Sequence, residues 1–105
     1  MKKTFKGNKA NLLLGKLPPQ NAEAEESLLS AILIDNSVIN DVVEILTPED
    51  FYRTRHQIIF RSIFELFENK EPVDLVTLTN QLQQNNALEE IGGASFLSRL
   101  AESNV

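Results

Sequence analysis

The side chains that could do chemistry in this sequence are few, and the chain has a single histidine. His56 could in principle act as a catalytic base or bind a metal ion. It lies, however, at the centre of a helical apolar stripe formed by Ile59, Phe60 and Ile63, which favours a buried, neutral histidine with one hydrogen-bonded ring nitrogen. The chain has no cysteine, so neither a thiolate metal site nor a disulfide can form. We therefore predict a structural role for His56 and no metal site.

A phosphate-binding loop is the second chemistry to consider. Gly15-Lys16 resembles the Gly-Lys pair of such a loop, but Leu17 stands where a Ser or Thr must bind magnesium. The preceding glycine, Gly7, is also too far away for the G-x-x-x-x-G-K spacing that forms the phosphate cradle. No cofactor-binding residue is predicted in this chain.

The fifteen acidic residues do not form a catalytic arrangement either. Glu23, Glu25 and Glu26 are typical of the first turns of a helix, where carboxylates face the positive end of the helix dipole. Glu49 and Asp50 are typical of a capped turn. Acid–base catalysis needs paired carboxylates in a pocket, so a solvated helix face is the favoured interpretation of both groups. We predict no catalytic residue.

Charge is distributed unevenly along the chain. Residues 1–16 hold five lysines and no acid, so the formal charge of −5 leaves −10 on the rest of the sequence. An acidic body repels phosphate backbones, and residues 1–17 are expected to form a flexible basic arm. A free-standing DNA-binding protein that uses this arm is the alternative hypothesis for function. Apolar runs are too short for a signal peptide or a membrane span, which predicts a cytoplasmic protein.

The elements that must position these residues are predicted to be helices, because no segment alternates with period two over the length of a strand. Asn21 is a suitable N-cap for the first of them. The predicted class is a compact all-α domain of about six short-to-medium helices. The expected helices cover Ala22–Ile34, Val38–Leu46, Thr54–Glu68, Leu75–Gln84 and Ala94–Ser103, with one short turn at Leu88–Ile91.

Several residues between these helices have predicted structural roles. Thr47–Asp50 resembles a capping box with proline at the first helical position, and this turn should deliver Phe51 to the core. Asp74 should cap the helix that follows it. Gly92 and Gly93 should end the short turn and let the chain enter the last helix at a new angle.

Four segments in order resemble the N-terminal domain of bacterial replicative DNA helicases of the DnaB family. Residues 18–29 resemble the family's P-P-x-x-x-E-A-E opening. The others are residues 47–60 (P-E-D-F-Y-x-x-x-H-x-x-I-F), residues 71–78 (P-V-D-L-V-T) and residues 88–100 (L-E-E-I-G-G, then Phe96, Leu97 and Leu100). One such segment would be a weak signal, but the ordered set is specific. The residues before Pro18 depart from the family pattern, which leaves the role of the arm open.

The resemblance implies that residues 18–105 form the helical collar domain of a homohexameric helicase that unwinds DNA at the replication fork. Its C-terminal ATPase motor, absent from this chain, would bind ATP, magnesium and DNA. The expected role of this fragment is assembly and primase docking without catalysis. Its expected partners are other copies of the helicase and the primase C-terminal domain, and a helicase loader is a further candidate.

Two residues are candidates for partner contacts. The position of Phe96 often carries an aromatic residue in the family, in the region that borders the primase-facing surface, although core packing is the competing interpretation. Ile58 lies nearly opposite the Ile63 stripe, beside Arg61 and Glu65, and is predicted to be an exposed apolar residue. A single exposed apolar residue is ordinary on a soluble domain, so the competing interpretation is that Ile58 has no functional role.

Overall fold

A computed structural model describes residues 21–102, and all regular structure in that range is helical. The longer helices are Ala22–Ile34 (α2), Thr54–Glu68 (α4), Leu75–Gln84 (α5) and Gly93–Glu102 (α6). The shorter helix Ser37–Val42 (α3) and the 3-10 turn Pro48–Asp50 (η1) lie between α2 and α4. The predicted all-α class is confirmed, while the predicted arm lies outside the described residues. None of the described helices is long and apolar enough to cross a membrane.

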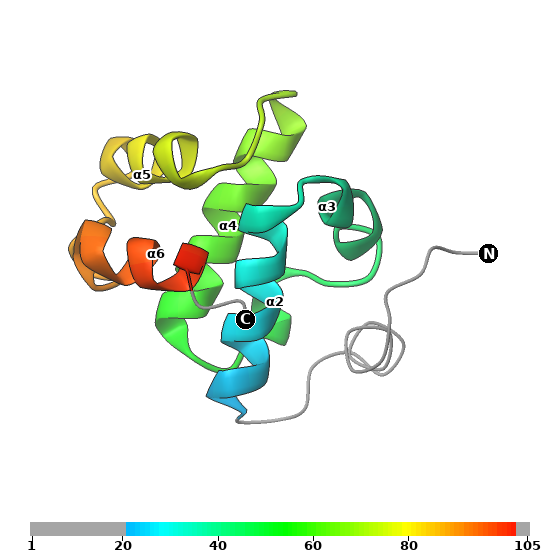
Figure 1. The fold of residues 1–105 in the computed structure, drawn as a ribbon, viewed down its shortest axis with the longest axis horizontal. Helices are drawn as coiled ribbons and strands as arrows, with labels where there is room; N and C mark the ends of the chain where they lie inside the picture. The colour runs from blue at the N-terminus through cyan, green and yellow to red at the C-terminus, as the bar shows by residue number, and fades with distance from the viewer. Residues whose placement is uncertain (1–20, 103–105) are drawn as a thin grey trace.

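Helices α2 and α4 run through the middle of the molecule, with α5 and α6 on one side and α3 on the other (Figure 1). Helix α2 contacts α3, α4 and α6, and α5 packs against both α4 and α6. In Figure 1, α2 and α4 both begin at the lower end of the molecule. The first turns of these two helices, which are far apart in the sequence, are therefore available to build one site.

The predicted bounds of α2, α4 and α5 are confirmed. The starts of α2 and α5 could be predicted from the sequence because each follows a capping residue. The Asn21 side chain accepts a hydrogen bond from the Ala24 amide at 2.9 Å. Asp74 accepts one from the Thr77 amide at 2.9 Å, and the Thr77 hydroxyl accepts one from the Asp74 amide at 2.9 Å. Each such cap satisfies backbone donors that the helix itself leaves unpaired and contributes about 1 kcal/mol.

The turn before α6 also forms as predicted. Gly92 has a φ of 112°, and its amide donates to the Glu89 carbonyl at 3.1 Å, while the Gly93 amide donates to the Leu88 carbonyl at 2.9 Å. A Cβ atom at position 92 would lie 3.0 Å from the Cβ of Phe96, which is closer than carbon atoms normally approach. Glycine at position 92 therefore allows both the turn and the close packing of Phe96.

The predicted helix at Val38–Leu46 is too long. Helix α3 ends at Val42, and both the Ile45 and Leu46 amides donate to the Val42 carbonyl as the chain turns. Leu46 is nevertheless buried, so the apolar pattern indicated burial correctly but not helix length. The last helix also begins one residue earlier than predicted, at Gly93.

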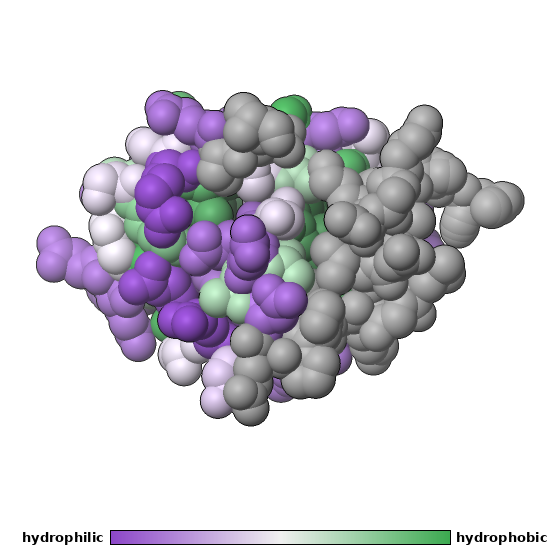
Figure 2. Space-filling view, turned by 60° about the horizontal axis from the view of Figure 1, so that its bottom comes forward, coloured by the Kyte–Doolittle hydropathy of each residue, from purple (hydrophilic) through white to green (hydrophobic). Residues whose placement is uncertain are grey.

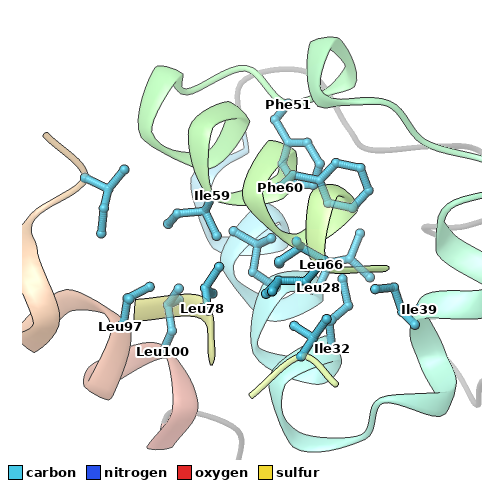
Figure 3. Packing of buried hydrophobic residues seen from close by; sticks show 14 of the residues in the cluster. Leu28, Ile32, Ile39, Phe51, Ile59, Phe60, Leu66, Leu78, Leu97 and Leu100 are labelled. Atoms are coloured by element: carbon cyan, nitrogen blue, oxygen red, sulfur yellow. The ribbon is translucent and has the colours of Figure 1, made fainter. Parts of the chain in front are cut away.

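The core lies where α2, α4, α5 and α6 meet (Figure 3). Phe51 is buried, as predicted, and its ring centroid lies 5.0 Å from that of Phe60 in a tilted arrangement. Aromatic pairs of this kind add about 0.5–1.5 kcal/mol to the effect of burial alone. Phe51 thus holds the segment that precedes α4 against the core.

A side-chain amide joins the end of α2 to the loop before α5. The Asn36 side chain accepts a hydrogen bond from the Val73 amide at 2.7 Å and donates to the Val73 carbonyl, and it also donates to the Ile32 carbonyl at 3.2 Å. Val73 is itself buried, so its backbone groups need these partners. The side-chain amide of Asn36 thus bonds both backbone groups of Val73, as a neighbouring strand would in a sheet.

Replacing Asn36 with alanine should lower the free energy of unfolding by about 1–3 kcal/mol, because the Val73 amide and carbonyl lose their partners. Urea unfolding followed by circular dichroism measures this directly. Asn40→Ala is the matched control, since Asn40 is exposed on α3 and its loss should change stability by no more than about 0.5 kcal/mol. Equal midpoints for the two variants would contradict the role given to Asn36.

Candidate functional site

His56 lies in the first turn of α4, beside the first turns of α2. Its side chain is fully buried, with Nδ1 2.6 Å from Glu25 Oε1 and Nε2 3.3 Å from Glu26 Oε2. The predicted burial is confirmed, but the expectation of a single hydrogen-bonded nitrogen is wrong, because both ring nitrogens face carboxylates. A substrate cannot reach a side chain enclosed in this way, and this arrangement makes His56 a link between α2 and α4.

The carboxylate of Glu25 has the most partners at this site. It is fully buried, and besides contacting His56 it accepts a hydrogen bond from the Tyr52 amide at 2.5 Å and one from the Arg53 amide at 3.4 Å. The interpretation of Glu25 as part of a solvated helix face is therefore wrong. The segment between η1 and α4 has backbone donors without helical partners, and Glu25 supplies their acceptor.

The ring of Phe96, on α6, lies against His56 with a centroid separation of 6.3 Å and an interplanar angle of 20°. Phe96 is only 6% exposed, which supports the core-packing interpretation over that of an open aromatic contact. The exposed area is small partly because charged side chains lie over the ring. Phe96 therefore joins the buried Glu25–His56 pair to the surface.

Two arginines lie over this ring. The guanidinium carbon of Arg55 is 4.4 Å from the ring centroid of Phe96, and that of Arg99 is 4.8 Å away. Arg99 also forms an ion pair with Glu26, at 3.7 Å between Nη1 and Oε1. A cation over an aromatic face is attracted by the ring quadrupole, and two such contacts on one ring hold both guanidinium groups in place. We call Arg55, Phe96 and Arg99 the arginine–phenylalanine cluster.

An open depression of about 660 Å³ adjoins this cluster and is lined by Tyr52, Arg53, Thr54 and Arg55. Tyr52 is 60% exposed and is one of the few large apolar side chains on the described surface. The face in Figure 2 brings forward the end of the molecule at which α2 begins, and the coloured part of it is mainly hydrophilic. The depression combines an aromatic ring with arginine donors, a composition typical of protein contact surfaces.

Neither the histidine nor the carboxylates of residues 21–102 are gathered into a metal-ligand set. No group of three His, Cys, Asp or Glu side chains in this range lies close enough together to hold a metal ion. The one histidine is enclosed by Glu25, Glu26 and Phe96. Recognition of another macromolecule is the chemistry that the exposed arginines and Tyr52 can perform.

The structure brings together only some of the residues that the sequence singled out. His56 and Phe96 are adjacent, and Gly92 lies directly against Phe96. Asp74 and Phe51 stabilise elements elsewhere in the fold, and Gly93 continues the turn with a φ of 80°. Ile58 is partly buried against the core, so the prediction of an exposed residue is wrong. Helix α4 has neighbours on several sides, in α2, α5 and η1.

Sequence reasoning missed Glu25, Arg55 and Arg99. A signal existed for Glu25, because it precedes Leu28, Leu29 and Ile32 at the helical spacing of one inward face. A signal also existed for Arg99, which follows Phe96 by three residues and so lies on the same side of α6. Arg55 had no such signal, since its contact with Phe96 joins two helices that are distant in the sequence.

Comparisons with known proteins agree with this helical architecture. Residues 17–105 match the family described as DnaB-like helicase N terminal domain. The chain is 46% identical over 94 residues to the replicative DNA helicase DnaB of Geobacillus stearothermophilus, and 46% identical over 93 residues to the replicative DNA helicase DnaC of Bacillus subtilis. These alignments cover 90% and 89% of the chain but only 21% and 20% of the relatives. The chain thus spans about a fifth of the length of these relatives.

A solved structure supports the same assignment. The N-terminal domain of DnaB helicase from Mycobacterium tuberculosis superimposes with a TM-score of 0.79 at 40% sequence identity. The match covers 84% of this chain and 61% of that one. Both the sequence and the fold of the described helices therefore agree with one family of domains.

Proposed function

Since the chain belongs to the family of DnaB-like helicase N-terminal domains, we propose that it is the assembly and primase-docking domain of a hexameric replicative DNA helicase. The motor that hydrolyses ATP and unwinds DNA would lie in the part of its relatives that this chain does not match. In this proposal the domain itself performs no catalysis and acts in the cytoplasm, in a collar formed with other copies.

The observation that carries the docking role is the site around Phe96. Buried contacts from α2 and α4 support the Phe96 ring from beneath, through Glu25 and His56. Arg99 is 59% exposed above it, and Tyr52 is exposed nearby. Rigid support under exposed arginine and aromatic side chains is typical of the residues that contribute most to protein–protein binding. The proposed partner at this site is the C-terminal domain of the cognate primase.

Calorimetric titration of the cognate primase C-terminal domain tests this proposal, both with the chain alone and with the full-length helicase. We expect saturable binding to the full-length protein, with a loss of at least about 2 kcal/mol when Phe96 is replaced by leucine, because the arginines lose the ring beneath them. Val76→Ala is the control, since Val76 is exposed on α5 and should not alter affinity. Equal affinities for all three proteins would contradict docking at Phe96.

A further inference from the structure

The basic residues of the described chain are concentrated in one place. Residues 21–102 contain five basic side chains, and three of them, Arg53, Arg55 and Arg99, lie at the depression or over the Phe96 ring. The same residues include all fifteen acids of the sequence, of which Glu25 and Glu26 lie at this site, so residues 21–102 as a whole are strongly acidic. The arginine–phenylalanine cluster is therefore an electropositive area on an acidic domain.

The arginines of the cluster are held in place before any ligand binds. Contact with Phe96 restrains both guanidinium groups, so less side-chain entropy is lost when a partner binds. Glu26 is the acidic group that faces Arg99, and it is itself partly exposed. The second carboxylate at this site, that of Glu25, is buried and already accepts hydrogen bonds from two backbone amides besides contacting His56. Glu26 is therefore the partly exposed carboxylate near the two guanidinium groups, each of which offers five N–H donors. Donor capacity therefore remains for carboxylates from outside the domain.

We propose that Arg55 and Arg99 make the docking surface selective for a partner segment that carries carboxylates. This inference rests on the proposed docking function and adds the chemistry of the segment that is recognised. Arg55 and Arg99 would bind carboxylates of that segment while Tyr52 and the depression accept an apolar side chain next to them. Pairs between arginine and carboxylate have a geometry that lysine does not reproduce, which favours a specific peptide contact.

An acidic peptide segment fits these observations better than a nucleic acid does. A nucleic acid would extend beyond the cluster onto the acidic surface, where its phosphates would be repelled. Single-stranded binding also relies on a row of open aromatic rings on which successive bases stack. Here the Phe96 ring is covered by His56 and the two arginines, which leaves Tyr52 as the exposed ring beside the cluster. A second copy of this chain is also acidic, so self-association through the cluster is an outcome that the test must distinguish.

The test compares two double variants of the full-length helicase in titrations with the cognate primase C-terminal domain. R55Q/R99Q removes the proposed charges without adding repulsion toward Glu26. R61Q/K70Q is the matched control: it also neutralises two charges, with Arg61 paired to Glu49 and Lys70 exposed in the loop after α4. At about 50 mM NaCl we expect R55Q/R99Q to bind about tenfold more weakly, and the difference should shrink at about 500 mM. The control should bind within about twofold of the unmodified protein.

Other outcomes separate this inference from the proposed function. If Phe96→Leu weakens primase binding but R55Q/R99Q does not, the docking function stands and the charge selectivity is wrong. If the unmodified helicase does not bind the primase domain, both are wrong. Sedimentation and binding to an oligothymidine of about 15 nucleotides complete the test. A loss of self-association or of oligothymidine binding in R55Q/R99Q, with primase affinity unchanged, would assign the arginines to those ligands and overturn the inference.

Discussion

An alanine in place of Glu25 is expected to lower the free energy of unfolding by about 3–5 kcal/mol. The substitution removes the acceptor for the Tyr52 and Arg53 amides and for His56 Nδ1, and these donors are held at the start of α4. Domains of this size are stable by about 5–15 kcal/mol, so the variant should be close to unfolding at physiological temperature. Urea or thermal unfolding followed by circular dichroism measures the loss.

Two matched variants separate hydrogen bonding from charge at Glu25. Glu25→Gln keeps an oxygen for the Tyr52 amide and can donate to His56 Nδ1, while Nε2–H of the histidine donates to Glu26. It loses only the longer 3.4 Å contact with the Arg53 amide, which shares Oε1 with His56. It should therefore recover more than half of the lost stability. Glu23→Ala removes an exposed carboxylate from the same first turn and should cost no more than about 0.5 kcal/mol. If Glu25→Ala were as mild as Glu23→Ala, the buried role of Glu25 would be wrong.

Phe96→Ala should also cost about 3–5 kcal/mol, because it leaves a cavity between α6 and α4 where a nearly buried ring had packed. The same change removes the ring from beneath Arg55 and Arg99. Thermal unfolding gives the stability, and titration with the primase domain gives the affinity. Both should fall in this variant.

Phe96→Leu separates the two effects at this position. Leucine retains much of the buried apolar volume, so most of the stability should remain, while the cation–aromatic contacts are lost. Val76→Ala again serves as the exposed control. A Phe96→Ala variant that is stable and binds primase normally would contradict both the packing and the docking roles of Phe96.

Local signals explain how much of the fold could be predicted from the sequence. Helices α2 and α5 begin at capping residues, Asn21 and Asp74, whose bonds reach only three residues along the chain. The turn at Gly92 is equally local, since it depends on a positive φ. Helix α3 was predicted too long because apolar spacing continues to Leu46 after the backbone has turned. The spacing of apolar residues therefore indicates which residues are buried, but not where a helix ends.

The site was less predictable than the fold because its contacts join distant segments. Glu25 contacts Tyr52 and His56 across 27 and 31 residues of sequence, and Asn36 contacts Val73 across 37 residues. Carboxylates at the start of a helix are explained by the helix dipole alone, so their position gave no reason to expect a long-range role for Glu25. The sequence did identify Phe96 and His56 individually. Their adjacency, and the arginines over the ring, depend on how α4 and α6 pack.

The central claim is that this domain docks the cognate primase C-terminal domain, and a mass measurement in solution tests it most directly. Sedimentation equilibrium of the full-length helicase, and of the chain alone, across a concentration series would be recorded without and with that primase domain. We predict a mass for the helicase that rises by whole primase domains and saturates at micromolar concentration, where the binding free energy is about −8 kcal/mol. A helicase mass that stays unchanged when the primase domain is in large excess would contradict the account.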